Sequence, residues 1–251
     1  MRLYVVRHAQ SADNQYVVEN AHKGVRSHGL DQSYVNRQAD PELSETGQKQ
    51  IESLGRFLSQ KRAGASEKAT RIDPFQDSFD FTHIYASLMV RTMATAGAVA
   101  DALHLTPAIW LDAHEMGGIW EPDGQGKPVG SPGKNRAYFQ NRFPHFALPD
   151  QLGEEGWWNR PVETAADCKH RAGRFFRELM ERHGGTQDRV AVVSHGLFYS
   201  FMLNAFLNIP SGSRISFAMN NAAMTRIDFV EDSIRVIYQN RSDYFPPELT
   251  T

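Results

Sequence analysis

The sequence contains a single cysteine, Cys168, among its 251 residues, so no disulfide can form within the chain. Proteins with so little cysteine are typical of reducing compartments, and we therefore expect a cytoplasmic location. Cys168 lies in a stretch with helical character and has no second cysteine nearby that would complete a metal site. We interpret it as a structural residue rather than a reactive thiol.

The sequence also lacks long apolar segments and an excess of charge of either sign. The first apolar run, Leu3–Val6, is too short for a secretory signal, and no later run approaches the length of a membrane span. The formal net charge is −2, which provides no global basic field for nucleic acid. We expect neither a membrane nor a nucleic acid as a partner, and we leave a homodimer open.

Short apolar runs alternate along the chain with stretches of helical periodicity. Strands are predicted at 3–6, 79–85, 108–111 and 190–193, and helices at about 44–61, 87–103, 162–183 and 197–208. Ser44 and Ser87 stand where helix N-caps are expected. Residues 222–230 and 234–239 predict a final antiparallel pair. This order favours an α/β fold of three layers, α/β/α, with a mixed, mostly parallel central sheet.

Two long segments show no periodicity, at about 15–42 and 117–161. We interpret them as irregular insertions within a single domain over 1–251, because loops of this length are uncommon unless they are functional. Their basic residues either bind a second anionic group of a substrate or remain solvated surface charges. These residues are Lys23, Arg26, His28 and Arg37 in the first segment, and Lys127, Lys134, Arg136 and Arg142 in the second.

Polar residues follow four predicted strands at their carboxyl ends. The groups are Arg7-His8, Ser87 leading to Arg91, His114-Glu115, and His195-Gly196. Ligands of open α/β sheets bind outside the carboxyl ends of the strands. If the four strands lie in one parallel sheet, two arginines (Arg7 and Arg91), the histidines His8 and His195 and the Glu115 carboxylate therefore share one rim.

This set matches what phosphoryl transfer through a histidine requires. Arginine forks neutralise a phosphate ester and hold it bidentately. A neutral imidazole nitrogen attacks phosphorus while the other ring nitrogen donates to a backbone carbonyl, which fixes the tautomer. A second histidine donates to a phosphoryl oxygen and an acid protonates the leaving oxygen. Backbone N–H groups of the helix that begins near Leu197 are expected to point at the phosphate.

The motifs that carry these residues resemble, in order, those of the histidine phosphatase superfamily in its phosphoglycerate mutase-like branch, branch 1. The matching segments are Arg7-His8-Ala9 with the downstream Asn14, Leu43-Ser44-Glu45-Thr46-Gly47, Ser87-Leu88-Met89-Val90-Arg91, Glu115-Met116-Gly117-Gly118-Ile119-Trp120-Glu121, and Ser194-His195-Gly196. Three positions depart from the family pattern: Ala9 and Pro122 replace glycines, and Leu88 replaces a proline.

The resemblance implies a role for each of these residues. His8 is the expected nucleophile, and Glu115 is the expected proton donor. The expected phosphate pocket consists of Arg7, Arg91 and His195, with Asn14 at its edge and Gly196 beside it. No metal or other cofactor is implied. Other carboxylates near Glu115 are Asp112, Glu121 and Asp123, and Asn220-Asn221 is interpreted as a turn.

The expected activity is a metal-independent phosphatase that hydrolyses a small phosphorylated metabolite, a phosphomonoester, through a phosphohistidine on His8. Mutases of the family carry an arginine and a tyrosine near the acid, and the segment His114–Gly118 has neither. A phosphoglycerate mutase-type phosphotransferase is the alternative. A catalytically weak member that only binds phosphate ligands is a further alternative, because the methyl group of Ala9 could crowd the pocket. A zinc hydrolase is disfavoured, because Gly118 stands where a helical zinc motif needs histidine.

Overall fold

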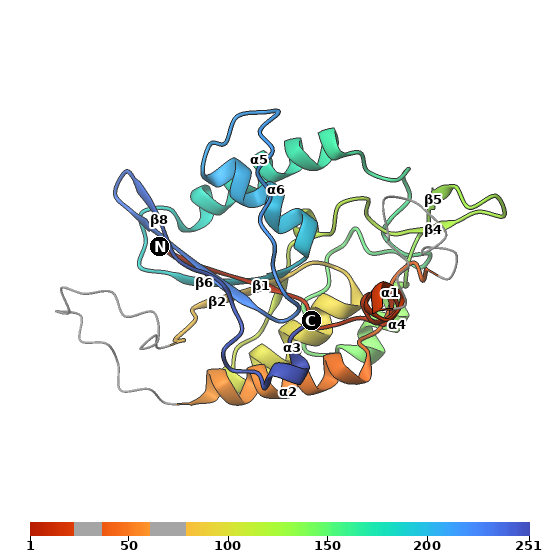
Figure 1. Cartoon of the computed structure of the whole chain (residues 1–251), viewed down its shortest axis with the longest axis horizontal. Coiled ribbons are helices and arrows are strands. Elements are labelled where there is room, and N and C mark those ends of the chain that lie inside the picture. Colours follow the sequence, from red (N-terminus) through yellow and green to blue (C-terminus); the bar gives the residue numbers. More distant parts are fainter. Residues whose placement is uncertain (23–36, 61–78) are drawn as a thin grey trace.

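A six-stranded sheet forms the centre of the computed structural model, which describes residues 1–22, 37–60 and 79–251 (Figure 1). Its strand order is β3-β2-β6-β1-β7-β8. Strands β1 (Arg2–Arg7), β6 (Arg189–Ser194), β2 (His83–Ala86) and β3 (Ala108–Ile109) are parallel. Strands β7 (Met224–Val230) and β8 (Ser233–Arg241) extend the sheet as the predicted antiparallel pair.

Helices cover both faces of this sheet. The side chains of β1 alternate, with Tyr4 and Val6 packed in one core and Leu3 and Val5 in the other. The first core is closed by α2 (Glu45–Ser59) and α3 (Val90–Leu103), and the second by α5 (Ala165–His183) and α6 (Gly196–Phe206) (Figure 1). The predicted three-layer arrangement with a mixed, mostly parallel sheet is therefore confirmed.

The two segments predicted to be irregular contain regular structure. Helix α1 (Ala12–His22) begins soon after β1. The second segment forms a two-stranded sheet of β4 (Trp120–Pro122) and β5 (Pro128–Gly130), followed by α4 (Arg136–Arg142). The prediction missed these elements because they are short, and because the apolar residues of α1 do not repeat on one side. Lys23, Arg26 and His28 lie outside the described residues.

Several predicted boundaries are also wrong. Strand β2 begins at His83 rather than at 79, and β3 ends at Ile109, where a 3-10 turn, η2 (Leu111–Ala113), takes over. Helix α5 begins at Ala165 rather than at 162, because Thr164 and Asp167 form a capping box there. A second 3-10 turn, η3 (Pro247–Leu249), lies near the end of the chain. Within the described residues, no helix is long and apolar enough to cross a membrane.

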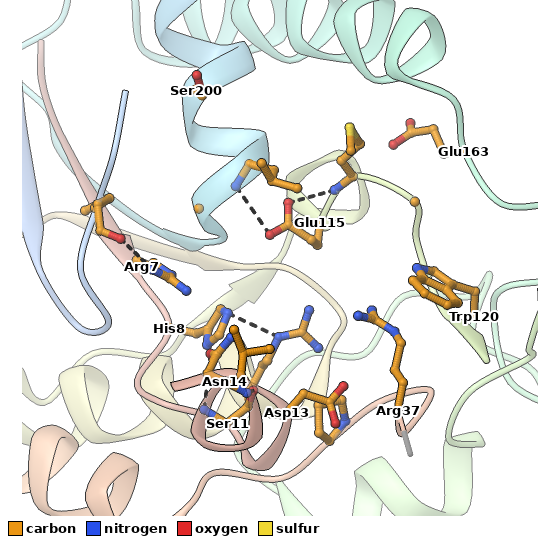
Figure 2. Close-up of a pocket in the computed structure, with 18 of the residues that line it drawn as sticks. Arg7, His8, Ser11, Asp13, Asn14, Arg37, Glu115, Trp120, Glu163 and Ser200 are labelled. Atoms are coloured by element: carbon orange, nitrogen blue, oxygen red, sulfur yellow. Dashed lines mark hydrogen bonds between the residues drawn. The ribbon is translucent and has the colours of Figure 1, made fainter. Parts of the chain in front are cut away.

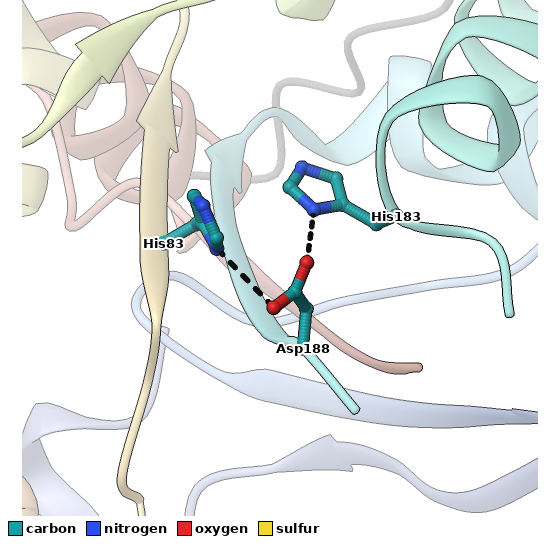
Figure 3. A group of neighbouring side chains, drawn as sticks. All are labelled: His83, His183 and Asp188. Atoms are coloured by element: carbon teal, nitrogen blue, oxygen red, sulfur yellow. Dashed lines mark hydrogen bonds and ion pairs between the residues drawn. The ribbon is translucent and has the colours of Figure 1, made fainter. Parts of the chain in front are cut away.

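A cluster of three titratable side chains lies at the amino end of the parallel strands, where β2 and β6 begin (Figure 3). His183 donates from Nδ1 to Asp188 Oδ2 at 2.8 Å, and its Nε2 accepts from the Tyr85 hydroxyl at 3.0 Å. The hydrogen bond from His183 lowers the pKa of Asp188. His83 lies 4.0 Å from the same carboxylate. Both ring nitrogens of His183 are thus engaged, and the cluster ties the end of α5 to the sheet.

Candidate active site

The carboxyl ends of the parallel strands form one edge of the sheet, and a cavity of about 820 Å³ opens there (Figure 2). Most of the predicted site residues line this cavity: Arg7, His8, Asn14, Arg91, Glu115 and Gly196. His195 is fully buried and does not line it, although its ring centroid lies 5.1 Å from that of His8. The expected shared rim is therefore present, with His195 placed beneath the surface.

His8 follows β1 directly and is only 3% exposed. Its Nδ1 lies 2.7 Å from the carbonyl oxygen of Ala9, which can only accept, so Nδ1 carries the proton. The Nε2 atom accepts from Nε of Arg91 at 3.2 Å (Figure 2). Burial, together with Arg91 and Arg7, holds the pKa of His8 well below its usual value. His8 is therefore a neutral imidazole with its lone pair at Nε2, in the tautomer that was predicted.

Arg91 lies in the first turn of α3, in front of a buried carboxylate that the sequence did not reveal. Its Nη1 is 3.7 Å from Oδ1 of Asp40. Asp40 also accepts from the backbone N–H of Val90 at 3.0 Å, so Asp40 occupies the N-terminus of this helix. Burial raises the pKa of Asp40 to about 6, although Arg91 opposes the shift. The prediction that Ser87 caps α3 is wrong, because the Ser87 hydroxyl bonds to Thr92 and His195 instead.

Arg7 is held at the other side of the cavity by the segment that precedes β7. Its Nη1 donates to the carbonyl oxygen of Met219 at 2.5 Å. A Cβ added at Gly196 would lie 3.3 Å from Nε of Arg7, so the glycine leaves room for the guanidinium. Burial lowers the pKa of Arg7, while Glu115 across the cavity opposes that shift. The two arginines thus line the same cavity as His8.

Glu115 lies across the cavity from His8, and its side chain faces the N-terminus of α6 (Figure 2). Its Oε1 accepts from the N–H groups of Met116 at 2.8 Å and Phe198 at 2.9 Å, and its Oε2 accepts from Leu197 at 3.4 Å. The expectation that the N-terminus of α6 points at the phosphate is therefore wrong, because two of its N–H groups bind Glu115. The neighbouring carboxylates Asp112, Glu121 and Asp123 do not line the cavity.

Asn221, which the sequence indicated only as a turn residue, fixes two parts of the site. Its Nδ2 donates to the carbonyl oxygen of His8 and to Oδ1 of Asn14, both at 3.1 Å. Ala9 is fully buried in the core, and its N–H donates to Oγ1 of Thr95 at 3.0 Å. The methyl group of Ala9 therefore packs away from the cavity and does not crowd it.

The outer walls of the cavity are largely apolar. They include Tyr16, Trp120, Val162, Leu197 and Phe217. Among the basic residues of the two insertions that the structure describes, only Arg37 lines the cavity, where its guanidinium stacks 4.0 Å above the ring of Trp120. Arg136 instead donates to carbonyl oxygens of its own insertion.

Comparison with known proteins assigns the family. The model of the histidine phosphatase superfamily (branch 1) matches residues 63–242, so the chain belongs to this superfamily. The matched residues include Arg91, Glu115 and His195, and they begin after Arg7 and His8. A probable phosphoglycerate mutase of Yersinia pestis is 24% identical over 159 residues, which are 60% of this chain. The chain spans 64% of the length of that relative.

Two solved structures share the fold across nearly the whole chain. A phosphoserine phosphatase variant from Entamoeba histolytica, in complex with phosphoserine, is 14% identical with a TM-score of 0.57, and the match covers 98% of this chain and 99% of that one. A mycobacterial glucosyl-3-phosphoglycerate phosphatase is 18% identical with a TM-score of 0.58, and covers 96% and 99% of the two chains. At these identities the likeness is one of fold.

Proposed function

We propose that this protein is a metal-independent phosphatase that hydrolyses a phosphomonoester through a phosphohistidine on His8. The observation that carries the proposal is the state of His8. Its Nε2 keeps a lone pair at the floor of a cavity lined by Arg7 and Arg91, because Nδ1 is committed to the Ala9 carbonyl. A neutral imidazole between two guanidinium groups suits attack on a bound phosphate dianion.

In the first step of the proposed reaction, Arg91 turns its Nε–H from His8 to a phosphoryl oxygen. The Nε2 lone pair of His8 then bonds to phosphorus as the P–O ester bond breaks. Glu115 gives its proton to the leaving oxygen, and we assign that proton to Oε2, which has only the long 3.4 Å contact with Leu197. In the second step water attacks phosphorus, Glu115 takes a proton from it, and the P–N bond breaks to release inorganic phosphate.

The outer part of the cavity favours a substrate whose organic group is larger and less polar than the glycerate group of phosphoglycerate. Beyond the arginines the walls carry Tyr16, Trp120 and Phe217, and the carboxylates Asp13 and Glu163 also line the space. Glu163 is already paired with Arg171, and Arg37 also lines the space, so the support for such a substrate is the apolar character of these walls. The alternative, a mutase, is supported by the 24% identity to the Yersinia pestis protein that is named a probable phosphoglycerate mutase.

The test is phosphate release from a panel of phosphomonoesters in the presence of EDTA. The panel holds aryl and alkyl phosphates, sugar phosphates and 3-phosphoglycerate. We expect release with EDTA present, and faster turnover of the aryl and alkyl esters. Transfer of phosphate between two positions of phosphoglycerate, without net release, would instead establish the mutase.

His8→Ala should abolish turnover, by more than about a thousandfold, because it removes the nucleophile. Wild-type protein that is quenched during turnover of a phosphorus-labelled substrate should carry an acid-labile label, and the variant should carry none. His145→Ala is the matched control, because His145 is exposed and outside the cavity. Near-normal hydrolysis by His8→Ala would rule out this mechanism.

A further inference from the structure

A chain of short hydrogen bonds fixes the proton positions beneath the cavity. Oγ1 of Thr92 lies 2.7 Å from the carbonyl oxygen of Met89 and 2.7 Å from Oγ of Ser87. Oγ of Ser87 lies 2.7 Å from Nε2 of His195. Each of these contacts needs a proton between the two atoms, because two lone pairs at this distance repel.

The proton count has a single solution along this chain. A carbonyl oxygen can only accept, and Oγ1 of Thr92 also lies 3.0 Å from the carbonyl oxygen of Ser87, so the Thr92 hydroxyl proton points at these two carbonyls and not at the Ser87 hydroxyl. The Ser87 hydroxyl must therefore donate its proton to Oγ1 of Thr92. No hydroxyl proton is left for the last contact, so Nε2 of His195 carries one and donates it to Ser87.

The other ring nitrogen of His195 is left without a proton in the neutral ring. Nδ1 of His195 is buried and has no hydrogen-bond partner among the described residues. The ring is fully buried, and the charged or titratable groups around it are His8 after β1, Arg91 on α3, Arg171 on α5, His114 after η2, and Glu115 at the start of α6. Burial and the nearby cations lower the pKa of His195 well below its usual value, so the resting ring is neutral.

We propose that a tetrahedral oxyanion enters this site together with one proton, which is held at Nδ1 of His195. A neutral histidine has only one N–H group, and His195 already donates the one at Nε2 to the Ser87 hydroxyl. An incoming anion needs hydrogen-bond donors. Its negative charge also offsets the positive charges of Arg91 and Arg171, which disfavour a protonated His195. Ser87 and Thr92 are therefore positioning residues: they set the tautomer that makes anion binding depend on a proton. The proposal rests on the proposed function, in that it places the anion beside His8, and the His195 ring lies directly beneath that position, with its centroid 5.1 Å from that of His8.

Inorganic sulfate is the probe, because it stays a dianion throughout the neutral range and does not itself take up protons. Binding is followed by titration calorimetry at pH 8 in buffers of different ionisation enthalpy, which counts the protons exchanged. We expect about one proton taken up for each sulfate bound. Sulfate that binds with no proton uptake would overturn this inference and leave the proposed function standing. Failure of sulfate to bind at any concentration tested would contradict the proposed phosphate site as well.

Two variants test the assignment through the tautomer. Ser87→Ala removes the acceptor of Nε2, so the neutral ring can carry its proton at Nδ1 and uptake should fall towards zero. Thr92→Val frees the Ser87 hydroxyl to donate to Nε2, which should have the same effect with the serine still present. His8→Asn tests the other imidazole of the site, and each sulfate that binds to this variant should still take up about one proton. Loss of uptake in His8→Asn, with uptake retained in the other two variants, would place the proton on His8 and overturn the assignment.

Discussion

Asp40 is a single residue through which pH can act on the whole site. It is fully enclosed between the N-terminus of α3 and Arg91, and burial raises its pKa from 3.8 to about 6. Above that value its negative charge holds the Arg91 guanidinium beside His8. Below it the carboxyl is neutral and Arg91 loses its ionic partner. The pKa of His8 itself is well below the usual value of 6.5, again because of burial.

We predict that kcat/KM rises with pH through about 6, as Asp40 ionises, and that Asp40→Asn removes this rise. The variant should lose about tenfold in kcat/KM above pH 7, because a misplaced Arg91 no longer holds the phosphate in line. The measurement is a pH–rate profile of both proteins. Asp150→Asn, at an exposed aspartate, is the control and should keep the wild-type profile.

The same titration should appear in stability. Between pH 3.8 and about 6 the folded protein holds a proton on Asp40 that the unfolded chain has lost. The contribution of Asp40 is fully present below the lower value, and it falls as pH rises through the upper one. Urea unfolding at several pH values should show this negative slope in the wild type, and the slope should be reduced in Asp40→Asn. Equal slopes in the two proteins would show that Asp40 does not titrate in this range.

Among single residues, the sequence predicted those that follow strands and missed those that act through other residues. His8, Arg91 and Glu115 could be placed because strand ends of a parallel sheet meet at one edge. Asp40 and Asn221 come from segments without periodicity, and only the folded chain brings them against Arg91 and the His8 carbonyl. No local pattern marks a residue whose partner is distant along the chain.

At the scale of elements, helix α2 packs against the segment that follows His8, the proposed nucleophile. Ser44 caps the helix by accepting from Gly47 N–H, as predicted, and its hydroxyl lies 2.7 Å from Oε1 of Gln10. Gln50 accepts from the backbone N–H of Gln10 at 2.7 Å. The segment Leu43–Gly47 could be recognised from the sequence as a family motif. Its structural role could not be predicted, because that role depends on how closely α2 approaches Gln10.

Gly47 allows that approach, since a Cβ there would overlap the carbonyl oxygen of Gln10. We predict that Gly47→Ala lowers both the melting temperature and kcat, because the chain after His8 must move. Gly55→Ala, in the same helix, is the matched control. Its Cβ would meet its nearest neighbour at an ordinary 3.7 Å, so it should be neutral or stabilise by up to about 1 kcal/mol. Similar melting temperatures and rates for the two variants would contradict this account of the motif.

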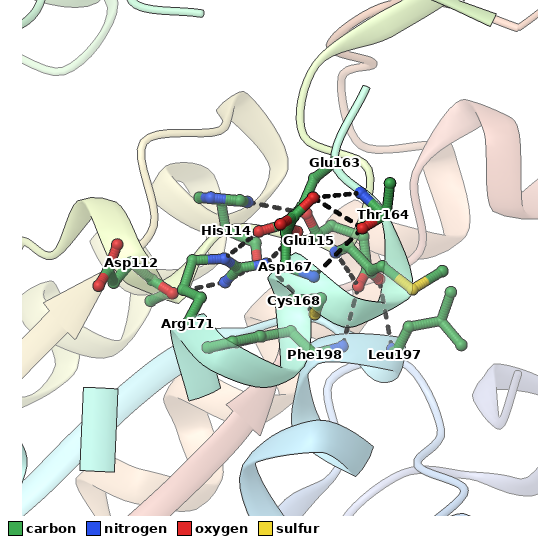
Figure 4. A network of polar contacts seen from close by, with 12 residues as sticks. Asp112, His114, Glu115, Glu163, Thr164, Asp167, Cys168, Arg171, Leu197 and Phe198 are labelled. Carbon is green, nitrogen blue, oxygen red and sulfur yellow. Dashed lines mark hydrogen bonds and ion pairs between the residues drawn. The ribbon is translucent and has the colours of Figure 1, made fainter. Parts of the chain in front are cut away.

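At the scale of the whole molecule, Arg171 joins the helical layer to the loop that carries the expected acid (Figure 4). From α5 it binds the Glu163 carboxylate through two contacts of 2.6 and 2.7 Å. Its Nη1 donates to the carbonyl oxygens of Asp112 and His114 at 2.6 and 3.0 Å, just before Glu115. The guanidinium also lies 4.0 Å above the ring of Phe198 on α6. One buried cation thus links α5, Glu163 and α6 to the loop that leads into Glu115.

Arg171→Met should therefore lower the free energy of unfolding by about 3–5 kcal/mol, because it leaves the Glu163 carboxylate unpaired in the interior. Arg174→Met is the matched control: that side chain is 49% exposed and pairs with Asp112, so its loss should cost less than about 1 kcal/mol. Adding Glu163→Gln to Arg171→Met should recover part of the loss. Urea unfolding of the four proteins measures these differences.

The loosened loop should also affect the chemistry. In Arg171→Met the fall in kcat should be larger for alkyl phosphates than for p-nitrophenyl phosphate, because a poor leaving group depends more on a well-placed proton from Glu115. If Arg171→Met were as stable as Arg174→Met, the link between α5 and the loop would carry no energetic weight. An equal fall in kcat for both classes of ester would instead separate the stability role of Arg171 from the placement of Glu115.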